Sequence, residues 1–305
     1  MKIAAARYPV GAPRDFAAYA EKQALFLGEA AHAGARLAVL PEYLALELAA
    51  MFSDEVRSDF AASLAALQPL HEPWLALYSR LARSLRMYIN AGTFLLASGP
   101  QRYRNRSYLF APDGGHAWQD KLRLTGFEKA SGVIESGDAL TVAEIDALRV
   151  GIAVCYDIEF PLPVRAQCEA GARLLLVPRC TDTDAGANRV RVGCLARALE
   201  NRCFVAQSVT TGRANWSPAL DANTGEAALL APMDTGLPAD GVVAQTSAHA
   251  HWAIADLEVA ALDASRINAQ VANDRDWSSQ YFPTILRARV LRSSAATPTQ
   301  AAETV

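Results

Sequence analysis

Short apolar runs without alternation recur along this chain and predict buried strands. Val150 to Val154 is the clearest run, because none of its residues carries a charge. A strand buried on both faces has such a continuous pattern, whereas a strand with one solvated face alternates. This pattern and weaker strand signals predict strands at residues 2–7, 37–40, 87–96, 105–110, 118–124, 141–145, 148–154, 174–177, 204–209, 227–230, 242–245 and 252–255.

Segments with a mostly helical pattern lie between these runs. Residues 15–33 are rich in Ala, Leu, Glu and Lys, and Gly34 is a suitable helix stop. Residues 53–86 predict helix with a break near Pro69 and Pro73. Further helices are predicted at residues 161–172, 187–202 and 258–270.

The order of these elements predicts an α/β fold with mixed sheets and helices on the outer faces. Some strands follow each other directly, as at 105–110 and 118–124, where the turn Pro112-Asp113-Gly114-Gly115 joins them. Other strands are separated by helices, which is typical of parallel neighbours. No internal repeat or shift in composition divides the chain, so we expect one domain.

Composition narrows the possible functions. Of 305 residues, 51% are hydrophobic and 20% charged, which is enough for a large core. The net charge of -3 and the scattered Lys and Arg residues argue against nucleic-acid binding, and no apolar run reaches the roughly 20 residues of a membrane span. Arg7 interrupts the N-terminal apolar run, so we expect no signal peptide. The five cysteines contain no CxxC pair, which favours a reducing cytoplasm and argues against a disulfide framework or a metal site.

Cys155 is the first candidate for chemistry. It ends the apolar run at 150–154, and Pro161 and Pro163 follow where a helix is expected to begin. A cysteine between a strand and a helix lies near the positive end of the helix dipole, so we expect its thiolate to be favoured. The alternative is one more buried cysteine, because free cysteine is among the most buried residue types.

A nucleophile needs a base and an oxyanion donor. The histidines at positions 32, 71, 116, 249 and 251 do not follow buried strands in a recognisable site context, so a Cys-His protease is weakly supported. Glu42 follows the strand at 37–40, and Lys121 lies inside the strand-like segment 118–124. Either residue alone is more often a solvated charge.

Taken together, the order Glu42, Lys121, Cys155 resembles the nitrilase superfamily of carbon–nitrogen hydrolases. The motifs that carry the resemblance are Leu40-Pro41-Glu42-Tyr43, Asp120-Lys121-Leu122-Arg123-Leu124 and residues 151–161. The resemblance extends from Lys2 to about Gln270 and includes residues 171–178 and 196–201. It implies a four-layer αββα sandwich, with a domain at 1–275 and a C-terminal extension at 276–305 that is partly flexible and contributes to an oligomer interface. The tail from Ser293 is rich in Ser, Thr, Ala and Pro, and we expect it to be mobile.

The resemblance also implies roles for individual residues. Glu42 is the general base, Cys155 the nucleophile, and Lys121 donates to the oxyanion together with the Tyr156 backbone N–H. A second glutamate follows the lysine motif, with Glu128 as the first choice and Glu135 as the alternative. The family mechanism needs no metal and no organic cofactor.

Three residues are candidate substrate contacts, namely Tyr43, Arg179 and Cys180. Arg179 stands where small or polar residues are common in the family, so it either meets a substrate carboxylate or is structural. Arg123 replaces a frequent histidine, which implies different local contacts. We interpret Cys168, Cys194 and Cys203 as packing residues, whereas Cys180 follows a strand end and is open to both interpretations. We expect the loops at 47–59, 181–188 and 215–225 to shape the pocket.

The predicted activity is amide hydrolysis through a cysteine thioester. Tyr156-Asp157 resembles the amidase branches, whereas branches acting on nitriles more often have Trp-Glu there. A nitrilase working through a thioimidate, a soluble acyltransferase and a non-catalytic interaction protein remain as alternatives. The expected partners are a small amide or nitrile and further copies of the chain in a homodimer or larger oligomer, with residues 161–172, 187–202 and the C-terminal segment as contacts.

Overall fold

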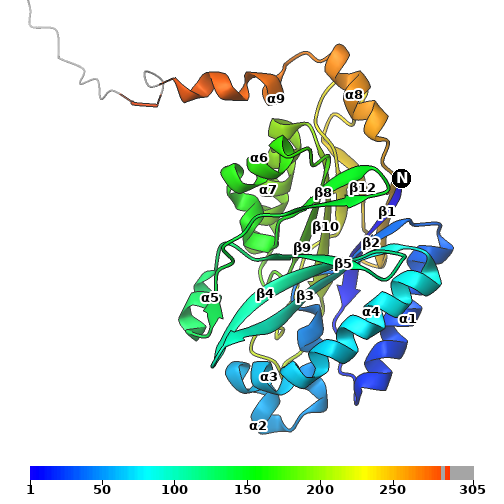
Figure 1. Cartoon of the computed structure of the whole chain (residues 1–305), viewed down its shortest axis with the longest axis vertical. Helices are drawn as coiled ribbons and strands as arrows, with labels where there is room; N and C mark the ends of the chain where they lie inside the picture. Colours follow the sequence, from blue (N-terminus) through cyan, green and yellow to red (C-terminus); the bar gives the residue numbers. More distant parts are fainter. Residues whose placement is uncertain (283–285, 289–305) are drawn as a thin grey trace, which may run out of the picture.

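The fold consists of two β-sheets flanked by helices (Figure 1). It was obtained as a computed structural model that describes residues 1–282 and 286–288. The strands are β1 (Lys2–Pro9), β2 (Leu37–Val39), β3 (Tyr88–Gly99), β4 (Arg102–Phe110), β5 (His116–Asp120), β6 (Ile134–Glu135), β7 (Val142–Ile145), β8 (Leu148–Ile152), β9 (Leu174–Arg179), β10 (Phe204–Thr211), β11 (Ala228–Leu230), β12 (Val242–Gln245) and β13 (Trp252–Asp256).

Most of the longer helices fall close to the segments with helical periodicity. The α-helices are α1 (Phe16–His32), α2 (Asp54–Arg57), α3 (Phe60–Leu67), α4 (His71–Leu85), α5 (Gly126–Ser131), α6 (Pro161–Glu169), α7 (Asp184–Asn201), α8 (Val259–Ile267) and α9 (Asn273–Asp276). The 3₁₀ helices are η1 (Leu44–Met51), η2 (Gln68–Leu70), η3 (Cys155–Glu159) and η4 (Trp277–Tyr281).

Two sheets meet at β1 and β10. One sheet runs β5-β4-β3-β2-β1 and the other β10-β9-β8-β7, and they join where Arg7–Pro9 pairs in parallel with Val209–Thr211. Strands β2 and β3 run parallel to β1, and β8 and β9 run parallel to β10. Because β4 is antiparallel to both β3 and β5, β5 has the same direction as β2. The carboxyl ends of β2, β5, β8 and β9 therefore point to one edge.

Strand β1 shows how the layers are built. Ala4, Ala6 and Tyr8 belong to the core that includes α1 and α4, whereas Ile3 and Ala5 belong to the core that includes β9, β10 and α7. Successive side chains on a strand point to opposite faces, so the first set faces helices and the second faces the other sheet. The arrangement is a four-layer αββα sandwich, which confirms the predicted fold class.

Two strands are shorter in the structure than predicted from the sequence. β5 ends at Asp120 and β8 at Ile152, so Lys121 lies just outside a strand rather than within one. The reason is a competing acceptor, because the amides of Leu122, Arg123 and Val154 donate to the Asp157 carboxylate.

The helical predictions also need correction. The predicted helix at 53–86 is split at Asp59, whose side chain caps α3, and again at Pro69 in η2. Pro73 does not break α4, because it lies in the first turn, where its missing N–H is not needed. The segments η1 and α5 were not predicted as helical. The tail from Ser293 lies outside the described residues.

Candidate active site

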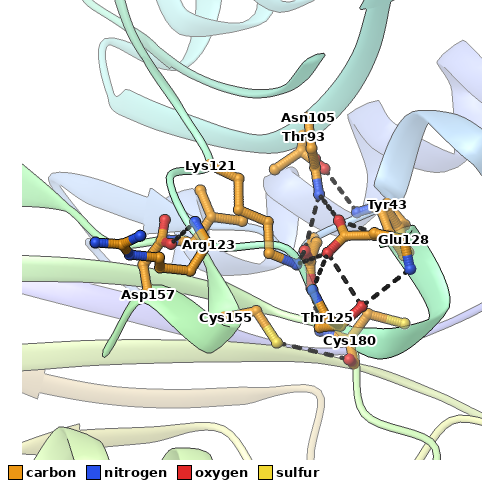
Figure 2. Close-up of polar contacts among 12 residues, drawn as sticks. Tyr43, Thr93, Asn105, Lys121, Arg123, Thr125, Glu128, Cys155, Asp157 and Cys180 are labelled. Carbon is orange, nitrogen blue, oxygen red and sulfur yellow. Dashed lines mark hydrogen bonds and ion pairs between the residues drawn. The ribbon is translucent and has the colours of Figure 1, made fainter. Parts of the chain in front are cut away.

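The candidate residues meet at the edge formed by the parallel strand ends. Glu42 follows β2, Lys121 follows β5, Cys155 follows β8 and Cys180 follows β9. Asn105 reaches the same region from the first half of the antiparallel strand β4. The structure thus brings together residues that are up to 138 positions apart in the chain (Figure 2).

Glu42 is buried and bridges the two sheets. Its Oε1 accepts hydrogen bonds from Lys121 Nζ at 2.8 Å and from Asn105 Nδ2 at 2.8 Å. Its Oε2 accepts from the backbone N–H of Cys180 at 3.1 Å. Burial raises the pKa of Glu42, and the Glu128 charge adds to this, although Lys121 opposes both. A carboxylate with a raised pKa is a better proton acceptor than a solvated one.

Lys121 lies between two carboxylates. Its Nζ is 2.8 Å from Glu42 Oε1 and 2.8 Å from Glu128 Oε2, and its side chain is 1% exposed. Burial on its own lowers the pKa of Lys121, but the two carboxylates outweigh burial and raise it well above the usual value. Lys121 is therefore held as an ammonium ion beside the cavity described below.

Glu128 occupies the third position of α5, in a capping box. The Thr125 hydroxyl accepts from the Glu128 amide, and Glu128 Oε2 accepts from the Thr125 amide at 2.9 Å. Its Oε1 accepts from the Tyr43 hydroxyl at 2.8 Å and from Asn105 Nδ2 at 3.2 Å. Although burial acts against it, Lys121 lowers the pKa of Glu128. Figure 2 shows these partners converging on the Glu128 carboxylate.

Glu135, the alternative second glutamate, lies elsewhere. It belongs to β6, its side chain is 41% exposed, and its Oε2 accepts from Ser98 Oγ at 3.0 Å. Of the two glutamates left open by the sequence, Glu128 is the one in contact with Lys121.

Cys155 begins η3 with a left-handed backbone, at a φ of 50°. Its Sγ lies 3.7 Å from the Cys180 carbonyl oxygen. Burial and the negative charge of Glu42 raise the pKa of the Cys155 thiol well above its usual value, and Lys121 only partly offsets them. The sequence-based expectation of a favoured thiolate is therefore wrong. The α-helix α6 begins only at Pro161, and burial outweighs the nearby positive charge.

The backbone at Tyr156 provides a free donor. Within the described part of the chain, its N–H donates to no backbone or side-chain acceptor. The Tyr156 ring packs edge-on against Phe160, with ring centroids 4.9 Å apart. An N–H next to a nucleophile and beside a cavity is suited to an oxyanion.

The three candidate substrate contacts have different surroundings. Tyr43 and Cys180 line the cavity, whereas Arg179 is not among the lining residues. The Arg179 guanidinium is buried and donates to the carbonyls of Ala187 at 3.0 Å and Glu226 at 2.7 Å. These contacts fit the structural interpretation of Arg179. Burial raises the pKa of Cys180 to about 12, so its side chain is a neutral wall of the cavity.

Residues with other sequence-based interpretations lie outside the cavity. The Arg123 guanidinium is 5.5 Å from the Phe160 ring centroid, and no histidine lines the cavity in the described part of the chain. His71 Nε2 is 2.8 Å from the Tyr108 hydroxyl, which is a structural contact. Cys168, Cys194 and Cys203 are buried, as packing residues are.

Two polar residues of this site were not predicted from the sequence, namely Asn105 and Asp157. Asn105 donates to both Glu42 and Glu128, and Asp157 accepts three backbone hydrogen bonds beside Lys121 and Cys155. The sequence signals that could have indicated them were an asparagine at the start of a predicted strand, Asn105, and an acid two residues after the cysteine, Asp157. Neither signal indicates burial, because burial depends on which strands become neighbours.

A cavity of about 270 Å³ opens over these residues. Its inner part is lined by Glu42, Lys121, Cys155 and Tyr156, and its charged outer residues are Glu159, Asp182, Arg189 and Asp221. Parts of the predicted pocket loops at 181–188 and 215–225 contribute, but the loop at 47–59 does not.

The arrangement combines a thiol, a buried carboxylate, an ammonium ion and a free N–H around one small cavity. This set can deprotonate a nucleophile and stabilise an oxyanion without a bound ion. Among the described residues, no cluster of three or more His, Cys, Asp or Glu side chains could hold a metal. No helix within that part of the chain has the length and apolar character to cross a membrane.

The chain is similar in sequence to known hydrolases. The sequence model of the carbon-nitrogen hydrolase family matches residues 2–258. The probable hydrolase YhcX of Bacillus subtilis is 27% identical over 277 residues, which cover 90% of this chain and 53% of YhcX. The chain therefore spans about half the length of that relative.

One further relative and one structural neighbour are amidases. Deaminated glutathione amidase of Mus musculus is 28% identical over 203 residues, covering 61% of this chain and 58% of the mouse protein. A mutant amidase of Nesterenkonia sp. AN1, solved with acrylamide added to its active-site cysteine, superposes with a TM-score of 0.67 at 21% identity. This match covers 91% of our chain and 99% of the Nesterenkonia chain, and it shows similarity of fold.

Proposed function

Because the chain belongs to the carbon-nitrogen hydrolase family of the nitrilase superfamily, we propose that it is an amidase that cleaves small amides through a thioester on Cys155. The observation that supports this proposal is the buried Glu42–Lys121 pair beside the Cys155 thiol at the inner end of one cavity. A neutral thiol next to a carboxylate of raised pKa is a nucleophile with its base in place.

In the first half of the reaction, Cys155 Sγ attacks the amide carbonyl carbon while Glu42 takes the thiol proton. The carbonyl oxygen becomes an oxyanion, which the Lys121 ammonium and the Tyr156 N–H stabilise by hydrogen bonding. The C–N bond then breaks, and Glu42 returns its proton to the departing ammonia or amine. The product of this half is a thioester between the acyl group and Cys155.

In the second half, water replaces the amine. Glu42 takes a proton from the water as it attacks the thioester carbonyl, and the same two donors stabilise the second oxyanion. The C–S bond breaks, the carboxylic acid leaves, and Cys155 regains its proton from Glu42. Protons therefore balance over the cycle with one carboxylate acting alternately as base and acid.

The outer part of the cavity supports a preference for neutral or cationic amides. Arg189 Nε lies 3.9 Å from Glu159 Oε1, so these two charges largely offset each other. Asp182 and Asp221 form no ion pair with any described residue, and both are exposed at the cavity. A substrate carboxylate entering there meets two like charges, and their repulsion is reduced but not removed by salt.

The test is a panel of short amides of equal length that carry no charge, an ammonium group or a carboxylate, together with the matching nitriles. Released ammonia and acid are measured for wild type, Cys155→Ala and Cys194→Ala. We expect amide hydrolysis by wild type, a loss of about 10³-fold or more in Cys155→Ala, and near-wild-type turnover in Cys194→Ala, whose buried cysteine is not in the cavity.

Mass spectrometry of rapidly quenched reactions is expected to find the acyl group on Cys155. Turnover of nitriles alone, or unchanged turnover by Cys155→Ala, would contradict the proposed function. Faster hydrolysis of the carboxylate-bearing amide than of the neutral one would contradict the proposed charge preference.

A further inference from the structure

Asp157 joins the two strand ends that carry the proposed lysine and nucleophile. Its carboxylate is buried and accepts from the backbone N–H of Leu122 at 3.0 Å, of Arg123 at 2.7 Å and of Val154 at 3.3 Å. Leu122 follows Lys121 in the segment after β5, and Val154 precedes Cys155 in the segment after β8. One side chain thus links a segment from each sheet.

The hydrogen bonds to Asp157 begin where the backbone hydrogen bonds between neighbouring strands end. The Lys121 N–H still donates to the carbonyl of Asn105 at 2.8 Å, as a strand residue would, whereas the next two amides donate to Asp157. In the other sheet, the Ala153 N–H still donates to the carbonyl of Leu176 at 3.0 Å. Figure 2 shows the Asp157 carboxylate beside the backbone of Arg123.

Titratable and charged groups lie on the elements next to this carboxylate, and Lys121 is the one whose charge acts on its pKa. Lys121 and Arg123 lie on the segment after β5, Cys155 and Glu159 on η3, and Arg189 and Arg197 on α7, which packs against η3. No cation within the described residues forms an ion pair with Asp157. Arg123 lies over the Phe160 ring, Arg197 binds Glu200, and Lys121 is bound to Glu42 and Glu128.

Burial therefore dominates the ionisation of Asp157. It raises the pKa of the carboxyl to about 6, although the backbone donors and Lys121 act in the opposite direction. The folded protein binds this proton more tightly than the unfolded chain does. Fold stability therefore decreases as the pH rises from about 4 to above 6, because ionisation of this carboxyl is less favourable in the folded protein than in the unfolded chain.

We propose that Asp157 is a positioning residue that sets the distance between Lys121 and Cys155 and that it works only as a carboxylate. This inference rests on the proposed amidase function. An ionised carboxylate is purely an acceptor, which suits three converging N–H groups. A protonated acid or an amide keeps one carbonyl acceptor but turns a donor toward one of those N–H groups, which weakens the link between the two segments. Retaining a destabilising buried charge fits a functional role better than a purely structural one.

The test compares Asp157→Asn with Asp234→Asn. Asp234 is a matched control because its side chain is 2% exposed and pairs with Arg202, away from the cavity. The Arg202 hydrogen bond lowers the pKa of Asp234, so the ionised form of this control stabilises the fold. For Asp157→Asn we expect kcat to fall at least tenfold, KM to change less than twofold, and Tm to be unchanged or higher. For Asp234→Asn we expect a lower Tm with kcat unchanged.

A second measurement does not depend on activity. Hydrogen exchange of the Leu122 and Arg123 amides, corrected for the intrinsic pH dependence, is expected to show protection above pH 6 that decreases below it in the wild type. In Asp157→Asn the protection is expected to be low at every pH, and in Asp234→Asn to match the wild type. Such a result supports the positioning role even if no amide in the panel is hydrolysed, which separates this inference from the proposed function.

Other outcomes overturn the proposal. An unchanged kcat in Asp157→Asn contradicts the positioning role. A lower Tm with an activity loss that matches only the unfolded fraction also does so, because this result describes a structural residue. Unchanged protection of the two amides in the variant contradicts the link between the strand ends.

Discussion

At the residue scale, the candidate site contains two carboxylates with different pKa values around one ammonium ion. Glu42 and Glu128 both bind Lys121 at 2.8 Å, yet the pKa of Glu42 is raised and that of Glu128 is lowered. Glu128 receives additional hydrogen bonds from Thr125 and Tyr43, which stabilise its charge. When two carboxylates share a site, such a difference assigns the proton to one of them. Glu42 is thus suited to exchange protons, and Glu128 to hold Lys121.

The replacement Glu128→Gln tests this division. The Glu128 charge contributes to the raised pKa of Glu42, so its removal is expected to lower the pKa of Glu42. Because the base works when ionised, the acid limb of kcat/KM is expected to move to lower pH, and kcat to fall about tenfold or more as Lys121 loses a partner. The measurement is the pH profile of amide hydrolysis. The control Glu135→Gln alters an exposed glutamate and is expected to leave the profile unchanged; a shift in the control alone would refute the assignment.

At the element scale, the site depends on how closely the strand ends approach one another. Gly92, inside β3, has a φ of 65°, and a Cβ there would collide with the carbonyl of Pro41. Pro41 directly precedes Glu42, so the glycine permits the approach of β3 to the segment that carries Glu42. A side chain at this position requires both backbones to move.

Gly92→Ala is therefore expected to destabilise the protein by roughly 2 kcal/mol or more, through backbone strain and displacement of Pro41. Gly28→Ala is the matched control, because this glycine lies in α1 with no atom near the added Cβ, and we expect a gain of about 0.5–1 kcal/mol. Urea unfolding of both variants provides the comparison. If the two variants had the same free energy of unfolding, the predicted clash between the added Cβ and the Pro41 carbonyl would be contradicted.

At the scale of the whole molecule, helices on two outer faces carry exposed apolar residues. Leu162 on α6 is 62% exposed and Val192 on α7 is 55% exposed, whereas Leu25 on α1 of the other outer face is 68% exposed. Helices α6 and α7 coincide with the segments at 161–172 and 187–202 that the sequence analysis assigns to oligomer contacts. The homo-oligomer, the domain at 1–275 and the extension at 276–305 remain proposals.

Light scattering provides the test of the oligomer. We expect a mass of at least twice the 32.7 kDa of one chain for the wild type and a smaller mass for Leu162→Asp, because a buried carboxylate at an interface lacks a partner. The control Leu25→Asp changes a similarly exposed leucine on the other face and is expected to keep the wild-type mass. A monomeric wild type, or dissociation by the control alone, contradicts the proposed contact surface.

Much of the fold and part of the site could be predicted from local sequence. Apolar runs located β1, β2, β8, β9 and β10, because a buried strand needs such a run whatever its neighbours are. The positions of Glu42 and Cys155 after apolar runs, and their order with Lys121, were sufficient to predict the αββα sandwich by resemblance. The structure confirms that fold and brings the three residues together.

Only the tertiary structure decided which polar groups share the buried space. The choice between Glu128 and Glu135 depends on α5, which places one glutamate on Lys121, while β6 leaves the other exposed. The raised pKa of Cys155 and the three hydrogen bonds of Asp157 depend on two sheets joined through β1 and β10. The sequence by itself therefore determined most strands and, through the motifs of the family resemblance, the fold class and the candidate residues. Burial and charge at the site were decided by strand order, since desolvation depends on neighbours that are distant in the chain.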